Sequence, residues 1–174
     1  GEWYSLTRPS NEELERQRQE RFDYMPKFSI VIPVYKTPER YLKEMLDSIL
    51  AQTYAKWEVC VADGSPRGES VERVLRRYAE KDRRFKYVIL GENKGISGNT
   101  NAAIDMADGD FIVLADHDDM MTPDALYECA KKINENPECD VLYSDEDKLD
   151  MDGGALFDPH FKPDFNIDLL RSVN

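Results

Sequence analysis

The chain has 174 residues, the size of one ordinary domain, and its 41% hydrophobic and 33% charged residues argue against disorder and against a fibrous repeat. Its formal net charge of −12 disfavours nucleic acid and anionic membrane as partners, because both attract a basic surface. No apolar run reaches the ~18 residues that a membrane-spanning helix needs.

Residues 1–26 are expected to form a helical extension. Ser10 followed by Glu13 is the pattern of a capping box, which predicts a short charged helix to about Arg21. Pro26 marks the junction with the main domain, which we expect to occupy residues 27–174.

Short apolar runs alternate with stretches of helical periodicity through the rest of the chain. We expect strands over 28–34, 57–63, 85–90, 110–116 and 140–145. We expect helices from Thr37 and Pro38 onward, and over 71–79, 99–107, 122–136 and 166–172. Strands separated by single helices predict an α/β fold: a mostly parallel, Rossmann-like sheet of about five strands with helices on both faces. Residues 146–163 are expected to be a loop with a turn at Gly153–Gly154.

The three cysteines, Cys60, Cys129 and Cys139, are an odd number and lack the CxxC spacing of a zinc site. We therefore expect three buried thiols in a reducing compartment, which predicts a cytoplasmic location.

Ligands of parallel sheets bind at the carboxyl ends of the strands, so the residues after each strand are the candidates for function. The turn after the first strand reads PVYKTPE and has no glycine. This excludes the GxGxxG pattern of dinucleotide-binding domains, and a Walker loop is absent as well. A bound nucleotide diphosphate therefore needs another source of positive charge.

Carboxylates at the end of the fourth expected strand are candidates to supply that charge through a metal. The sequence there reads LADHDD, so that Asp116 and Asp118 lie two residues apart on a turn. Residues 105–158 hold 17 acidic and 3 basic side chains, and the ordinary interpretation of such a run is a solvated acidic face. The alternative is that Asp116 and Asp118 hold Mn²⁺ or Mg²⁺, which prefer oxygen ligands and often share them with substrate phosphates.

Two other strand ends offer nucleotide contacts. Asp63 ends the second expected strand, where its carboxylate can accept a hydrogen bond from a base or a ribose hydroxyl. The alternative is that Asp63 caps its own turn beside Gly64. Tyr35 follows the first strand and is available to stack on a base, or else packs on the first helix.

Several ordered blocks of sequence resemble one known family. They read FSIVIPVYKTPERYLKEMLDSILAQTY, WEVCVADGS, NKGISGNTNAAI and ADGDFIVLADHDD. Together they resemble family 2 glycosyltransferases with the GT-A fold. The later blocks YSDEDKLD and FKPDFNIDLL are similar to the branch that builds bacterial surface polysaccharides, which includes rhamnosyltransferase-like enzymes.

The resemblance implies an inverting, metal-dependent transferase that moves a hexosyl-type sugar from a UDP- or dTDP-linked donor to a glycan or lipid-linked acceptor. The implied location is the cytoplasm, including a peripheral position at the inner face of the membrane. The implied site residues are Pro33, Val34 and Tyr35 around the base, Asp63 reading the base, Asn93, Lys94 and Gly95 beside the nucleotide, Asp116 on the ribose or metal, and Asp118 on the metal.

Two departures from the family pattern qualify these expectations. Family members carry their general base beyond the position equivalent to Asn174, so we expect a domain incomplete at its C-terminus and weak or inactive alone. Asp145 is the obvious substitute base, although we expect it to shape the acceptor side or close a turn. Asn99 stands where relatives often have a small apolar residue, which we expect to leave the metal site unaffected.

Three rival functions are weighed against transferase activity. The first is a nucleotide-sugar-binding module without turnover. The second is a sugar-1-phosphate nucleotidyltransferase, which the absence of a glycine-rich basic loop after the first strand disfavours. The third is an interaction domain without a ligand.

Overall fold

The computed structural model describes residues 8–150 and 155–172. The expected turn at Gly153–Gly154 lies outside these residues. The chain divides into two compact units, the first formed by residues 11–137 and the second including the described residues from 138 onward. The expected boundary at residue 27 stays a prediction.

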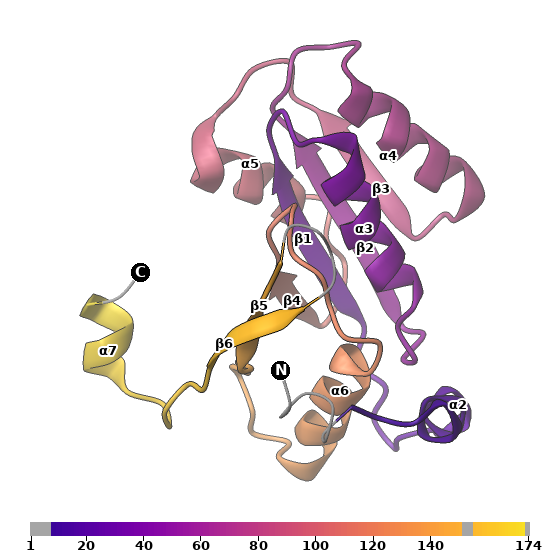
Figure 1. Ribbon diagram of the computed structural model, residues 1–174, viewed down its shortest axis with the longest axis vertical. Helices are drawn as coiled ribbons and strands as arrows, with labels where there is room; N and C mark the ends of the chain where they lie inside the picture. The colour runs from indigo at the N-terminus through magenta and orange to yellow at the C-terminus, as the bar shows by residue number, and fades with distance from the viewer. Residues whose placement is uncertain (1–7, 151–154, 173–174) are drawn as a thin grey trace. The chain divides into compact units, whose positions relative to one another are not determined.

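The first unit is built on a parallel sheet of four strands (Figure 1). The strands are β1 (Phe28–Val34), β2 (Trp57–Asp63), β3 (Phe85–Ile89) and β4 (Phe111–Leu114), in the order β3-β2-β1-β4. The two central strands are buried along almost their whole length, as expected of strands covered on both faces. The predicted parallel α/β sheet is therefore confirmed.

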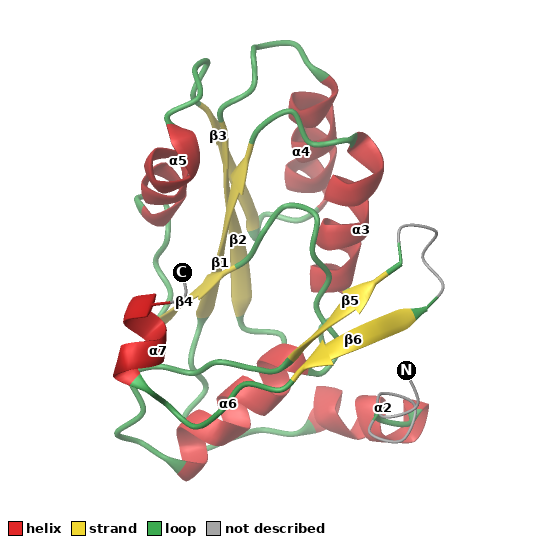
Figure 2. Ribbon diagram, turned by 60° about the vertical axis from the view of Figure 1, so that its left-hand side comes forward, coloured by secondary structure: helices red, strands yellow, loops and turns green. Residues whose placement is uncertain are grey.

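Helices cover both faces of the sheet (Figure 2). Helices α3 (Glu39–Leu50) and α4 (Ser70–Lys81) lie on one face, and α5 (Gly95–Ile104) covers the opposite face. Helix α6 (Ala125–Glu135) adds its apolar stripe to the side of α3 and α4. Helix α2 (Asn11–Gln19) joins this unit through buried Gln17, whose Oε1 accepts a hydrogen bond of 2.9 Å from Thr53.

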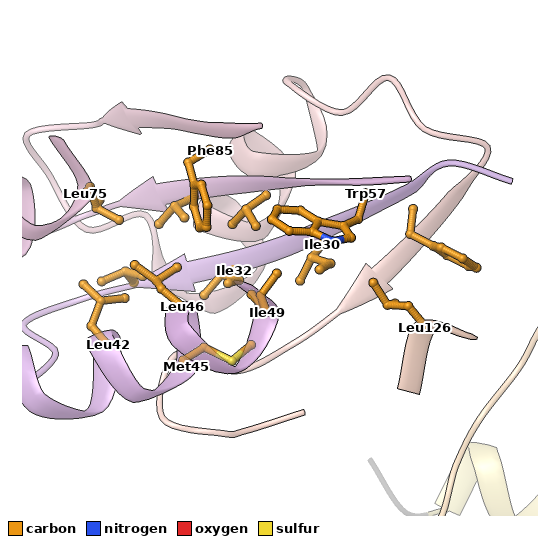
Figure 3. Close-up of a cluster of buried hydrophobic side chains, with 14 of the residues drawn as sticks. Ile30, Ile32, Leu42, Met45, Leu46, Ile49, Trp57, Leu75, Phe85 and Leu126 are labelled. Carbon is orange, nitrogen blue, oxygen red and sulfur yellow. The ribbon is translucent and has the colours of Figure 1, made fainter. Parts of the chain in front are cut away.

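The main core fills the space between β1, β2 and the helices α3, α4 and α6 (Figure 3). Ile30 and Ile32 point from β1 toward Leu46 of α3, and Trp57 and Phe85 meet edge to face with their centroids 5.7 Å apart. A smaller cluster under α5 consists of Val31, Cys60, Ala62 and Ala103. The alternation along β1 thus sends consecutive side chains into two different cores.

The second unit corrects the prediction of a fifth strand. Residues 140–145 are not a strand, and residues 146–163 are not simply a loop. Instead β5 (Glu146–Leu149) pairs antiparallel with β6 (Leu156–His160) in a separate two-stranded sheet. Two polar side-chain pairs, Glu146 with His160 and Lys148 with Asp158, join this hairpin. Apolar periodicity does not detect a strand pair whose side chains are mostly polar and exposed, which is why residues 146–163 were wrongly expected to be a loop. The chain then ends its described part in α7 (Ile167–Ser172).

Several local predictions also need correction. Helix α5 begins at Gly95 and not at residue 99, and α3 is capped at Pro38 and not by Thr37. The Thr37 hydroxyl is buried and has no hydrogen-bond partner among the described residues. Cys60 is buried as expected, whereas Cys129 and Cys139 are partly exposed; all three are free thiols. None of the helices in residues 8–150 and 155–172 has the length and apolar character needed to cross a bilayer.

A network of ion pairs around the buried Glu58 joins the amino ends of the strands. Glu58 of β2, whose side chain is 3% exposed, accepts hydrogen bonds from Lys27, Lys86, Ser29 Oγ and the Asp108 backbone N–H. Lys27 and Lys86 also pair with the Asp108 carboxylate. This network fixes the start of β1, β2 and β3 to the loop before β4.

Candidate functional site

The carboxyl ends of the four parallel strands meet at the edge of the sheet opposite the ion network. The order β3-β2-β1-β4 reverses direction at β1, so that the switch point lies between β1 and β4. Pairing between these two strands stops at Leu114, while β1 continues to Val34 alongside β2. Residues after Leu114 therefore leave the sheet beside the last residues of β1.

The loop after β1 is fixed to the loop after β2. The Gly64 N–H donates to the Val34 carbonyl at 2.9 Å, and the Lys36 N–H donates to Ser65 Oγ at 2.8 Å. Lys36 has a φ of 51°, a conformation that is costly for a residue with a side chain. The hydrogen bond that Lys36 donates to buried Ser65 stabilises that conformation, and Tyr35 beside it is 43% exposed at the surface. The neighbouring site residue Pro33 is partly buried.

Asp63 is buried at the end of β2. Its Oδ1 accepts a hydrogen bond of 2.8 Å from the Ser65 N–H, which is the turn-capping contact weighed as the alternative to base recognition. Burial raises the pKa of the Asp63 carboxyl, and hydrogen bonds from Ser65 oppose that rise only in part. Asp63 therefore caps the turn after β2. A role in reading the base stays a prediction.

The loop between β3 and α5 is held by a buried amide that sequence reasoning did not assign to the site. Asn99, 2% exposed, accepts a bond of 3.1 Å from the Lys94 N–H and donates one of 3.1 Å to Asn93 Oδ1. Asn93 Oδ1 also accepts from the Gly95 N–H at 3.0 Å. The expected nucleotide residues Asn93, Lys94 and Gly95 are thus brought into one exposed loop with a fixed shape.

Asp116 and Asp118 lie on the turn that follows β4. Both are exposed, and Asp118 Oδ1 is 3.5 Å from His117 Nδ1. Within residues 8–150 and 155–172, no three His, Cys, Asp or Glu side chains converge on a common point where a metal ion would be held. Mg²⁺ is commonly held by one or two carboxylates together with substrate phosphates, so these two aspartates fit an ion that arrives with a diphosphate.

Asp145 lies in the second unit. Its Oδ1 accepts a hydrogen bond of 2.8 Å from the Lys162 N–H, which joins the two residues that flank the β5–β6 hairpin. Next to it, Glu146 pairs with His160 at 3.1 Å and with Lys162 Nζ at 3.0 Å. These ion pairs lower the pKa of Glu146, with Lys162 as the main cause.

Two surface hollows lie away from the strand ends. One of about 230 Å³ opens between α3 and α4 and is lined by Lys43, Arg77 and Tyr78 among others. Another of about 240 Å³ lies beside α2, next to Gln17 and Tyr54. Neither hollow contains any of the predicted site residues.

Sequence reasoning missed Ser65 and Asn99, the side chains that brace the strand-end loops. The available indication for Ser65 was its position two residues after Asp63, which is the spacing of an Asx turn. Asn99 differs from the small apolar residue common at this position, but no sequence pattern predicts that its amide bonds the loop five residues earlier.

Comparisons with known proteins agree with this arrangement. Residues 29–166 match the family described as "Glycosyl transferase family 2". The chain is 44% identical over 149 residues to an uncharacterized protein of Sinorhizobium fredii, covering 86% of this chain and 16% of that protein. It is 33% identical over 172 residues to the O-antigen biosynthesis protein RfbC of Myxococcus xanthus, covering 99% of this chain and 13% of RfbC. The chain thus spans less than a fifth of either relative.

Two solved structures share the fold. Residues 1–349 of TarS from S. aureus, in complex with UDP-GlcNAc, match 64% of this chain and 32% of that chain, with a TM-score of 0.58 and 29% identity. The mannosyltransferase PcManGT from Pyrobaculum calidifontis, in complex with GDP-Man and Mn²⁺, matches 69% of this chain and 37% of that chain, with a TM-score of 0.55 and 26% identity.

Proposed function

The chain belongs to glycosyl transferase family 2 and has the GT-A fold, and we propose that it binds a nucleotide-diphosphate sugar at the carboxyl edge of its sheet. The proposed reaction is inverting transfer of a hexosyl-type sugar to a glycan or lipid-linked acceptor in the assembly of a bacterial surface polysaccharide. A cytoplasmic location, at or near the inner face of the membrane, is part of this proposal.

The observation that carries the proposal is the set of hydrogen bonds that fix the loops after three neighbouring strands at the carboxyl end of the sheet. The loops after β1 and β2 are joined through Ser65 and Gly64, the Leu90 N–H donates to the Asp63 carbonyl, and Asn99 fixes the loop after β3 from within. Preorganised loops lose little conformational freedom on binding, which favours a ligand that contacts all of them. The complex of TarS with UDP-GlcNAc supports a UDP-linked donor as the ligand of this edge.

Each strand end has a proposed role. Pro33, Val34 and Tyr35 form one side of the base pocket, and Asp63 orients the base from the end of β2. Asn93, Lys94 and Gly95 lie beside the nucleotide. Asp116 and Asp118 hold Mn²⁺ or Mg²⁺ together with the diphosphate, and the complex of PcManGT with Mn²⁺ supports this assignment. When bound, the cation neutralises charge on the leaving diphosphate.

Deprotonation of the acceptor hydroxyl requires a base within about 3 Å of that oxygen. Asp145 is the candidate in this chain, but its Oδ1 accepts the Lys162 N–H. The alternative function is therefore a nucleotide-sugar-binding module without turnover. Release of nucleoside diphosphate from a UDP-sugar in the presence of a glycan acceptor distinguishes the transferase from that module.

Donor binding is tested by thermal unfolding with UDP, dTDP and GDP, each with Mn²⁺ or with EDTA. We expect one nucleotide to stabilise the chain in Mn²⁺ and to do so much less in EDTA. A ligand at 100 times its dissociation constant adds about 2.7 kcal/mol to the free energy of unfolding, which a melting curve resolves. Equal stabilisation in EDTA contradicts the metal-assisted part of the proposal, and no stabilisation by any nucleotide contradicts the donor site.

Asp63→Ala is expected to weaken nucleotide binding by roughly 1–3 kcal/mol, because a buried hydrogen-bonding group loses its partner and the Ser65 turn loses its cap. Titration calorimetry of nucleotide and of free Mn²⁺ checks this. The affinity for Mn²⁺ alone should stay unchanged, since Asp63 lies at the end of β2 and the proposed metal ligands follow β4. A parallel fall of both affinities would place Asp63 in the metal site.

A further inference from the structure

Asn99 lies beneath the loop that joins β3 to α5. Its side chain is 2% exposed, whereas Asn93, Lys94 and Gly95 above it are exposed. A group this deeply buried does not contact a ligand on the loop surface. Any effect of Asn99 on binding must therefore act through the backbone and side chain that it holds.

The amide of Asn99 uses both of its ends on this loop. Oδ1 accepts from the Lys94 N–H at 3.1 Å, and Nδ2 donates to Asn93 Oδ1 at 3.1 Å. Asn93 Oδ1 in turn accepts from the Gly95 N–H at 3.0 Å, where the backbone has a φ of 75°. Asn99 thus fixes one backbone amide directly and a second through Asn93.

The loop after β2 is fitted against the same amide. A Cβ atom added to Gly64 would lie 2.8 Å from Asn99 Nδ2 and 3.1 Å from Asn93 Cα. Gly64 is also tied to β1 by the bond from its N–H to the Val34 carbonyl. Asn99 therefore lies where the loops after β2 and β3 pack closely, and a small apolar residue at this position would form none of these hydrogen bonds.

We propose that Asn99 is a positioning residue that holds the Asn93–Gly95 loop in the shape required to bind a nucleoside diphosphate. This inference rests on the proposed donor site, because it assigns the loop to the nucleotide. It extends the site beyond the strand-end residues to a buried amide on α5 that makes no contact with the ligand.

The test compares wild type with Asn99→Ala, Asn99→Asp and the control Asn101→Ala, which removes an exposed amide from the same helix. The first measurement is amide hydrogen exchange without nucleotide, followed by NMR. In Asn99→Ala the Lys94 and Gly95 amides should exchange at least about tenfold faster relative to the core strands, because both lose the bonds that fix them. In Asn101→Ala they should exchange as in wild type.

The second measurement is the affinity for UDP in Mn²⁺, with dTDP and GDP as alternatives. Asn99→Ala should lose about 10- to 30-fold in affinity, as expected for the loss of two hydrogen bonds that organise the loop. Asn99→Asp keeps an acceptor for Lys94 but places a buried carboxylate oxygen against Asn93 Oδ1, so it should also weaken binding. Asn101→Ala should stay within about twofold of wild type.

A double-mutant cycle separates positioning from general destabilisation. Gly64→Ala alone should weaken binding, because its Cβ meets the Asn99 amide. In the Asn99→Ala background its added effect should be smaller, since that amide is gone. Additive effects, or an unchanged UDP affinity in a folded Asn99→Ala chain, overturn the inference alone. Failure of wild type to bind any of the three nucleotides overturns the proposed function itself.

Discussion

Asp118→Asn is expected to remove most of the contribution that a divalent cation makes to nucleoside diphosphate binding, on the order of 2–4 kcal/mol. The proposed site has two carboxylates on the turn after β4 and few cations near the phosphates, so the metal supplies the positive charge. Replacing a carboxylate by an amide removes one negative ligand without changing its shape. The fold should be unaffected, because the Asp118 side chain is 59% exposed.

Calorimetric titration of UDP in Mn²⁺ and in EDTA measures this effect. The ratio of the two dissociation constants should shrink by roughly 30- to 700-fold in Asp118→Asn, the equivalent of the expected free energy. Asp105→Asn serves as the control, since it removes an exposed aspartate at the end of α5. If both variants change the ratio equally, the effect comes from the change in the protein's net charge, and Asp118 is not a metal ligand.

Glu58→Ala is expected to lower the free energy of unfolding by roughly 1–3 kcal/mol, the cost of leaving buried hydrogen-bond donors without their acceptor. The two lysines add little to this cost, because they are about a third exposed and keep Asp108 as a partner. Lys27, Lys86, Ser29 Oγ and the Asp108 N–H all lose their shared acceptor. Urea unfolding monitored by circular dichroism measures the change. Glu80→Ala, an exposed glutamate on α4, should change the stability by no more than about 0.5 kcal/mol.

The same network predicts a pH dependence with a definite sign. Burial alone would raise the pKa of Glu58, but hydrogen bonds led by that from Lys27 outweigh it and hold the pKa below its usual value. Asp108 and Glu58 conversely raise the pKa of Lys86. A carboxyl with a lowered pKa stabilises the fold above its unfolded pKa of about 4.3 and loses that contribution as the pH falls. The stability difference between wild type and Glu58→Ala should therefore narrow in acid; a constant difference down to about pH 2 would contradict the assigned ionisation.

The central strands could be predicted from the sequence because both are short and predominantly apolar. Residues 28–34 and 57–63 were predicted with the bounds that the structure shows for β1 and β2. The β5–β6 hairpin was not predictable in this way, since most of its side chains are exposed and two of its cross-strand pairs are polar. Sequence periodicity predicts a strand only where buried and exposed side chains alternate, and the side chains of this hairpin are mostly exposed.

The candidate site was predictable in its residues at the strand ends but not in what holds them. Asp63 ends β2 as expected, yet the contact to Ser65 depends on the local backbone. The bond from Lys36 to Ser65 joins loops 29 residues apart in the chain. Neither composition nor spacing shows which side chain will meet a backbone amide that far away. Glu58 is a similar case, because its lysine partners come from β3 and from the residue before β1.

The two ends of the proposed donor site should contribute differently to binding, because the loops proposed to contact the nucleoside are fixed by hydrogen bonds and the proposed metal ligands are exposed side chains. The loops after β1, β2 and β3 are fixed by hydrogen bonds in the folded chain, so their conformational entropy is lost during folding and not on binding. The Asp116 and Asp118 side chains, by contrast, are exposed to solvent. We therefore expect the choice among nucleobases to change little with ionic strength. The cation-dependent share of the affinity, which arises from exposed charges, should weaken as salt screens them.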